Sequence, residues 1–143
     1  MAMKQLTVFV ENKKGTLVSV TKILSEYNIN IRALSVAETQ DFGILRLIVD
    51  DAMQAMDALE EKNYLVKSID VVGVKIGDQP GKLNEALEVL ATADINVEYL
   101  YAFMTRTEKH AYVVLRVEDN ELAETTLKNA GFHLISEADI NKL

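Results

Sequence analysis

The sequence predicts an α+β protein of two tandem units, each with the order strand, helix, strand, strand, helix, strand. Two observations support this prediction: the chain repeats itself, and its hydrophobic residues follow strand and helix periods in the same order in both halves. The segment EYNINIRALS (residues 26–35) is echoed by ADINVEYLY (residues 93–101), and Asn96 follows Asn30 by 66 positions. The other pairs that share this offset are Gly15 and Gly81, Leu17 and Leu83, Leu24 and Leu90, Ile29 and Ile95, and Leu34 and Leu100.

In the first half, alternating β-rich runs predict strands and one-sided apolar stripes predict helices. One such stripe recurs every three or four residues from Leu17 to Tyr27. The second helix opens with the acidic pair Asp50 and Asp51, which the positive end of a helix dipole favours. The expected strands cover residues 5–10, 30–38, 44–49 and 65–69, and the expected helices cover residues 16–27 and 50–62.

The second half repeats this order, and the offset grows to 68 after the second strand, where Leu127 corresponds to Leu59. A two-residue insertion in the turn at residues 105–110 accounts for the change. The expected strands cover residues 70–76, 96–104, 111–117 and 132–136, and the expected helices cover residues 81–93 and 120–130. Because crossover connections are right-handed, each unit should form an antiparallel four-stranded sheet with both helices on one face, the ferredoxin-like arrangement. The predicted units span residues 1–69 and 70–143.

The two faces of each predicted sheet can be separated by the alternation of side chains. The positions expected to face the helices are Leu6, Val8, Val10, Leu34, Leu45 and Leu47, with Val72, Val74, Ile76, Leu100, Val113 and Leu115 in the second unit. The helix-free face then carries Phe9, Ile44, Ile48, Tyr99, Tyr101, Phe103, Tyr112 and Val114. A face this apolar should not stay in water, so we expect a second sheet to cover it in a two-fold homodimer. The alternative is that the two units of one chain cover each other.

Composition excludes several functional classes. The chain has no cysteine, a net charge of −7 and no run of apolar residues that approaches the length of a membrane span. The N-terminus lacks the apolar core of a signal peptide, so the cytoplasm is the expected location. An RNA-recognition motif shares the element order, but its third strand needs a basic residue and alternating aromatics, which both halves lack. We therefore expect no membrane and no nucleic-acid partner.

The motifs of common catalytic and cofactor sites are missing from the sequence. It contains neither a phosphate-binding GxxxxGK[ST] loop nor a GxGxxG fingerprint, and no serine lies in a nucleophile elbow. The two histidines, His110 and His133, have no cysteine or acidic neighbours at metal-ligand spacing, so we interpret them as ordinary turn and strand residues. We predict no catalytic residues, no metal and no cofactor.

The loop after the first strand of each half is the remaining candidate for chemistry. ENKKGTL (residues 11–17) and GDQPGKL (residues 77–83) both place a glycine where a strand leads into a helix. The first backbone N–H groups of a helix can bind a carboxylate, and glycine permits its close approach. Lysines at these loops would be unfavourable beside a helix N-terminus unless an anion is near. Solvated lysines beside a structural turn glycine explain the same residues equally well.

The doubled βαββαβ unit, the D-x-P-G-x-L pattern of residues 78–83 and the Ile-Asn-Val run of residues 95–97 together resemble the ACT domain, a small regulatory module of amino-acid metabolism. The resemblance covers nearly the whole chain and leaves no room for a catalytic domain. The first repeat departs from the pattern, because Asn12 to Gly15 contains no proline. The resemblance implies that an amino acid binds between two modules, at the first loop of one and the start of the second strand of its neighbour. The implied ligand residues are Asn12, Gly15, Leu17, Asn30 and Ile31, and Asp78, Gly81, Leu83, Asn96 and Val97.

On this basis the sequence predicts a non-enzymatic sensor of a free amino acid that acts on a metabolic enzyme. The alternatives are a ligand-free assembly module, an enzyme built on the same sandwich, and an RNA-binding protein. Asn30 and Asn96 are open to two interpretations from the residues alone: amides suited to an ammonium and a carboxylate, or turn residues that follow a helix.

Overall fold

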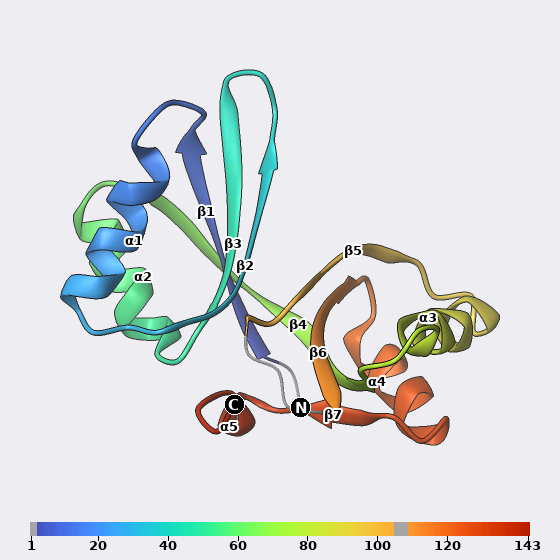
Figure 1. Ribbon diagram of the computed structural model, residues 1–143. Helices are drawn as coiled ribbons and strands as arrows, with labels where there is room; N and C mark the ends of the chain where they lie inside the picture. Colours follow the sequence, from blue (N-terminus) through green and yellow to red (C-terminus); the bar gives the residue numbers. More distant parts are fainter. Residues whose placement is uncertain (1–2, 105–108) are drawn as a thin grey trace. The chain divides into compact units, whose positions relative to one another are not determined.

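The computed structural model describes residues 3–104 and 109–143, which form two compact units: residues 4–69, and residues 70–143 together with Met3. Each unit has the predicted βαββαβ order, with an antiparallel sheet and both long helices on one face of it. In Figure 1, α1 and α2 lie together beside the strands of the first unit, and α3 and α4 lie together in the second. The fold class predicted from the sequence is confirmed.

The first unit contains a sheet of order β2-β3-β1-β4, and its two helices pack against each other. In its antiparallel pairs Leu6 of β1 lies opposite Leu47 of β3, and Leu34 of β2 lies opposite the same Leu47. The elements are β1 (Met3–Glu11), α1 (Thr16–Glu26), β2 (Ile31–Glu38), β3 (Phe42–Val49), α2 (Ala52–Glu61) and β4 (Leu65–Gly77).

The second unit uses the C-terminal part of β4 as its first strand and has the order β5-β6-β4-β7. Its further elements are α3 (Lys82–Thr92), β5 (Val97–Ala102), β6 (His110–Val117), α4 (Asn120–Asn129), β7 (His133–Ile135) and α5 (Glu137–Ile140). Two details differ from the sequence expectation. The strands expected at residues 65–69 and 70–76 form one continuous strand, and the last strand is shortened by α5. The turn expected at residues 105–110 lies mostly outside the described residues.

The short helix α5 follows from a local hydrogen-bond motif that hydrophobic periodicity does not register. Asp139 Oδ2 accepts hydrogen bonds of 2.9 Å from both the backbone N–H and the hydroxyl of Ser136, which forms a capping box. The backbone hydrogen bond from Ser136, followed by that from its hydroxyl, lowers the pKa of Asp139 from its ordinary value. Ile140 anchors this helix, since it is 1% exposed.

Each unit has its own hydrophobic core between its sheet and its helices. In the first, Leu6, Val8 and Leu47 pack with Leu24 and Leu59, and in the second Val74, Leu115, Leu90 and Leu127 take the corresponding places. The predicted helix-facing side chains are therefore buried, with one pair of exceptions. Leu34 and Leu100 are 37% and 36% exposed. They lie on the edge strands β2 and β5.

The aromatic side chains expected on the helix-free faces differ in exposure. Tyr101, Phe103 and Tyr112 are only 7–8% exposed, and the rings of Phe103 and Tyr112 meet edge-on at 6.3 Å. Phe9 is the exception at 36%, and Lys67 Nζ lies 5.7 Å from the centre of its ring. The homodimer expected through the helix-free faces stays a prediction.

Acidic residues at helix starts have the structural role expected of them. Asp51 and Asp119 are the N-cap residues of α2 and α4, and each carboxylate accepts a hydrogen bond of 3.1 Å from a first-turn N–H. Within residues 3–104 and 109–143, no cluster of histidine, aspartate or glutamate side chains could hold a metal ion. The same residues contain no helix that is long and apolar enough to cross a membrane.

Candidate functional site

The two glycine loops have nearly identical backbones. Gly15 is the N-cap of α1 with φ 88° and ψ −7°, and Gly81 is the N-cap of α3 with φ 88° and ψ −9°. No side chain caps either helix, in contrast to α2 and α4. The first-turn N–H groups of α1 and α3 are therefore not taken by a capping side chain, as binding of a carboxylate would require.

Asn12 and Asp78 hold equivalent places in these loops and tie them to the next turn of the sheet. The Asn12 side chain donates to Thr39 O at 3.2 Å, and its backbone N–H donates to Asp41 O at 3.0 Å. The backbone N–H of Asp78 donates to Lys109 O at 2.9 Å. The Asn12 Nδ2 group is thus engaged, which leaves its Oδ1 and the Asp78 carboxylate as acceptors for a ligand ammonium.

The two leucines among the implied ligand residues, Leu17 and Leu83, differ in burial. Leu83 packs against the core of the second unit, whereas Leu17 is 45% exposed on α1. Leu17 is followed by Val18, which is 67% exposed, so the first turn of α1 presents an apolar surface.

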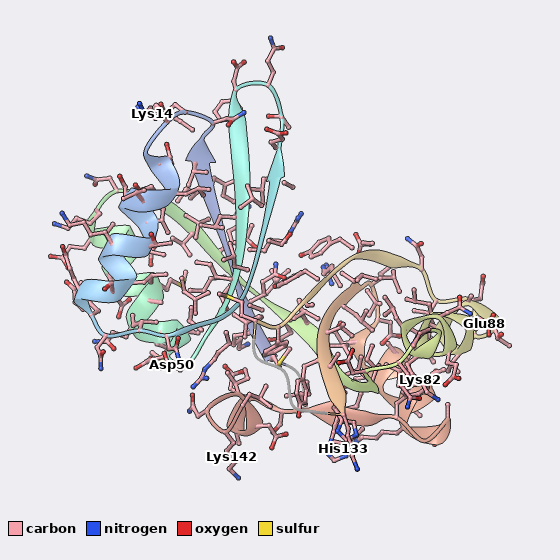
Figure 2. The ribbon with its side chains drawn as sticks, viewed as in Figure 1. Lys14, Asp50, Lys82, Glu88, His133 and Lys142 are labelled. Atoms are coloured by element: carbon pink, nitrogen blue, oxygen red, sulfur yellow. The ribbon has the colours of Figure 1, made fainter. Side chains whose placement is uncertain are left out.

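Asn30 and Asn96 lie at the opposite end of their units from the glycine loops. The 11-residue helix α1 separates Gly15 from Asn30, a length of about 16 Å at 1.5 Å per residue. Figure 2 shows this separation: Lys14 lies beside one end of α1 and Asp50 lies near the other. Asp50 Oδ1 accepts from the Asn30 backbone N–H at 3.0 Å. The structure therefore does not bring the predicted site residues together within one unit.

Ile31 and Val97 begin the edge strands β2 and β5, directly after these asparagines. Both are partly buried and pack against the cores of their own units. Each lies at the same end of its unit as the adjacent asparagine, away from the glycine loop. They could form the apolar floor of a site only for a loop that comes from another module.

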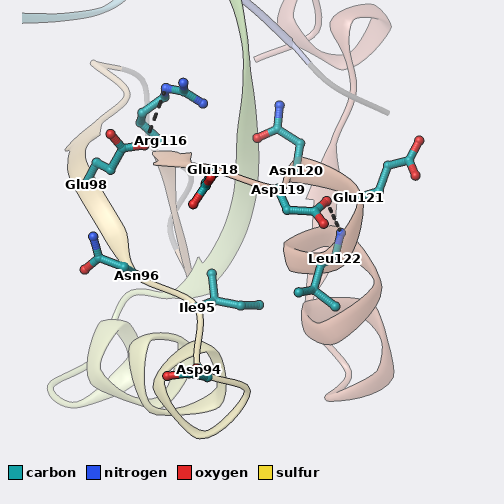
Figure 3. A pocket seen from close by; sticks show the side chains of 10 residues that line it. All are labelled: Asp94, Ile95, Asn96, Glu98, Arg116, Glu118, Asp119, Asn120, Glu121 and Leu122. Carbon is teal, nitrogen blue, oxygen red and sulfur yellow. Dashed lines mark hydrogen bonds and ion pairs between the residues drawn. The ribbon is translucent and has the colours of Figure 1, made fainter.

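Asn96 lines an open cavity of about 990 Å³ in the second unit that the sequence did not reveal (Figure 3). Its wall carries Arg116, which lies 3.9 Å from the Glu98 carboxylate, and Asn120, whose Nδ2 donates to Asp70 O at 3.1 Å. The acidic residues that line it are Asp94, Glu98, Glu118, Asp119 and Glu121. They come from the start of β5, the end of β6 and the start of α4, so only the fold collects them. The cavity suits a cationic group more than an anionic one.

The first-repeat loop lines a second cavity, of about 500 Å³, together with the connection between α2 and β4. Lys13 and Gly15 lie on its wall, and Lys13 Nζ pairs with Glu11 at 3.0 Å. Thr16 Oγ1 is buried here and has no hydrogen-bond partner among the described residues. An unpaired buried hydroxyl at the first turn of α1 is available to a ligand atom.

Comparison with known proteins gives a consistent result. The family of ACT domain pairs matches residues 1–143. A crystal structure of a protein from Bacteroides thetaiotaomicron is 38% identical, with a TM-score of 0.93, 100% of this chain covered and 98% of the other. The regulatory subunit of aspartate kinase from Thermus thermophilus, in its ligand-free form, is 18% identical with a TM-score of 0.64, and the alignment covers 90% of this chain and 91% of that subunit. The corresponding subunit from Thermus flavus is 17% identical with a TM-score of 0.62, over 89% and 91% of the two chains. No curated protein matches the sequence significantly.

Proposed function

Since the chain belongs to the family of ACT domain pairs, we propose that it is a regulatory protein that binds a free amino acid and catalyses no reaction. The observation that carries the proposal is the pair of uncapped helix N-termini behind Gly15 and Gly81, which share one backbone conformation. The fold shared with aspartate kinase regulatory subunits supports a regulatory role. The partner would be a metabolic enzyme in the cytoplasm, whose activity changes when the amino acid binds.

In the proposed site, first-turn N–H groups of α1 or α3 take the carboxylate of the ligand. The acceptor at Asn12 or Asp78 takes its ammonium, since a desolvated charge needs a partner. Leu17 or Leu83 contacts the ligand side chain. The start of a second strand from a neighbouring module completes the site, with Asn30 and Ile31 or with Asn96 and Val97.

A second copy of the chain can supply that neighbouring strand to the first repeat. The strand β2 is an edge strand with exposed apolar side chains, Leu34 at 37% and Val36 at 47%. Antiparallel pairing of two β2 edges about Ser35 would set Leu34 against Val36 of the other copy. The same pairing would bring Ile31 of that copy close to Thr39, to which Asn12 is hydrogen bonded. The loop and the β2 start, separated within a unit, would then be neighbours.

Light scattering at micromolar concentration tests this assembly. We expect a dimer that Val36→Glu dissociates, because the new carboxylate would be buried at the pairing edge. Met53→Glu is the matched control, since Met53 is 81% exposed and belongs to α2 and not to the pairing edge. If the unmodified protein scatters light as a 16 kDa monomer, or if both substitutions have equal effects, the chain does not dimerise through β2.

A thermal-shift screen of the twenty amino acids tests the sensor itself. A ligand at about 100 times its dissociation constant stabilises the folded chain by roughly 2.7 kcal/mol, which shifts the midpoint by on the order of 10 °C for a chain of this size. The variants Asn30→Ala and Asn96→Ala then identify the working repeat, since the one that abolishes the shift without moving the unliganded midpoint marks the site. If no amino acid moves the midpoint and none co-purifies, the chain is a ligand-free assembly module instead.

A further inference from the structure

Both histidines of the chain line one cavity, although 23 positions separate them in the sequence. This cavity, which we call the histidine cavity, measures about 360 Å³ and belongs to the second unit. It lies where the end of β4, the first turn of α3, the start of β6 and the connection from α4 to β7 meet. Figure 2 labels two of its residues, Lys82 and His133.

Strand register explains why the two histidines converge. His110 of β6 lies opposite Gly77, and His133 of β7 lies opposite Lys75, so β4 runs between the two histidine-bearing strands. Residues directly opposite each other in an antiparallel pair project from the same face, and so do residues two apart on one strand. His110, His133 and Lys75 therefore share one face at the end of the sheet.

Lys82 reaches the same place from α3. A Cβ built on Gly77 would lie 3.1 Å from Cγ of Lys82, so the lysine stem runs directly over this glycine. The absence of a side chain at Gly77, which is the register partner of His110, leaves room for that stem. Lys82 Nζ lies 3.5 Å from Glu85 Oε1, and both side chains are well exposed at 39% and 57%, so this ion pair is weak.

The local charge is opposite to that of the whole chain. Four of the nine residues around the cavity are lysine or histidine and only Glu85 is acidic, in a protein of net charge −7. An anion in this cavity would therefore meet lysine ammonium groups and imidazole N–H donors with only one carboxylate nearby.

The first repeat shows that the fold does not require these four residues. At the offsets of 66 and 68, the positions that correspond to Lys75, Lys82, His110 and His133 are Phe9, Thr16, Phe42 and Leu65. None of the four is charged, yet the first unit has the same architecture and a cavity at the equivalent loop. The cationic set is particular to the second repeat.

We propose that the histidine cavity binds a small molecule through a phosphate group, as a site additional to the amino-acid site. The Nζ groups of the two lysines donate to phosphate oxygens, and the imidazole N–H groups of the two histidines can do the same. A cavity of this size holds one phosphate group and a small substituent.

Proton NMR of the two imidazole rings tests the proposal on the full chain, with chloride used to keep the ionic strength constant. We titrate inorganic phosphate, glycerol phosphate as a phosphate monoester, and succinate as a dianion without phosphorus. The signals of His110 and His133 should follow one saturation curve with either phosphate compound. The variant Lys75→Gln/Lys82→Gln should weaken that binding by about tenfold or more.

The matched control is Lys13→Gln/Lys14→Gln, which removes the same charge at the first-repeat loop and should leave the curve unchanged. If the binding curve does not saturate, or if both double variants lose the same amount of affinity, the cationic side chains attract anions only through their general positive charge and do not form a site. If the histidine signals saturate with succinate but with neither phosphate compound, the assignment of phosphate would be overturned. Tighter binding of glycerol phosphate than of inorganic phosphate would identify a phosphate monoester as the ligand.

Discussion

Replacement of Gly81 by alanine isolates the conformational cost of the loop that begins α3. Gly81 has φ 88°, in the left-handed region that L-residues rarely adopt. A Cβ built at this position has no heavy atom within 4 Å, so the substitution causes neither a clash nor a cavity. The expected destabilisation is therefore the backbone term alone, about 1–2 kcal/mol.

Denaturant unfolding followed by circular dichroism measures this change. The midpoint should fall while the dependence of the unfolding free energy on denaturant stays the same, because the surface exposed on unfolding is unaltered. The melting temperature should drop by roughly 3–10 °C, the range for domains of 70 to 150 residues. Gly15→Ala should lose a similar amount, since Gly15 has the same φ and an equally empty surrounding.

Asparagine provides the control that identifies the cause. Asn tolerates the left-handed region better than alanine, so Gly81→Asn should cost less than Gly81→Ala despite its larger side chain. In an ordinary conformation, a change from glycine to alanine stabilises a protein by about 0.4–1 kcal/mol. An unchanged or raised midpoint for Gly81→Ala would refute the left-handed loop, and so would equal losses for both variants.

Four further substitutions test other parts of the structure. Leu90→Ala should lower the free energy of unfolding by about 2–5 kcal/mol in a denaturant titration, because Leu90 is 0% exposed in the second core. Asp51→Ala and Asp119→Ala should each lower it by about 1 kcal/mol in the same assay, through loss of an N-cap. The hydrogen bonds from Ser136 lower the pKa of Asp139 in the folded state below its value in the unfolded state. The contribution of Asp139 to stability is therefore present above the unfolded pKa, and it is lost as the pH falls through the folded pKa. Melting temperatures measured on acidification should therefore fall less steeply for Asp139→Asn, and an unchanged slope would contradict this assignment.

Features that depend on local pattern could be predicted from the sequence. Helix and strand periods placed the long helices within one or two residues, and the matching order in both halves gave the fold class. Alternation along β1 and β4 correctly assigned Leu6, Val8, Val72 and Val74 to the cores, because a period of two depends only on the strand itself. The loop glycines could also be found, since a repeated glycine between strand and helix indicates a special backbone conformation.

Other features became known only from the tertiary structure, because they depend on which elements lie next to each other and on how far each element extends. Leu34 and Leu100 have core-facing parity yet remain exposed, and both lie on the edge strands β2 and β5. Gly15 and Asn30 are both implied ligand residues of the first repeat, but the helix α1 between them holds them at opposite ends of the unit. His110 and His133 seemed unrelated in the sequence, and the pairing of two strands with β4 brings both to one cavity. Local patterns determine which elements form and which face each side chain takes, whereas the convergence of distant residues depends on strand pairing, which periodicity does not encode.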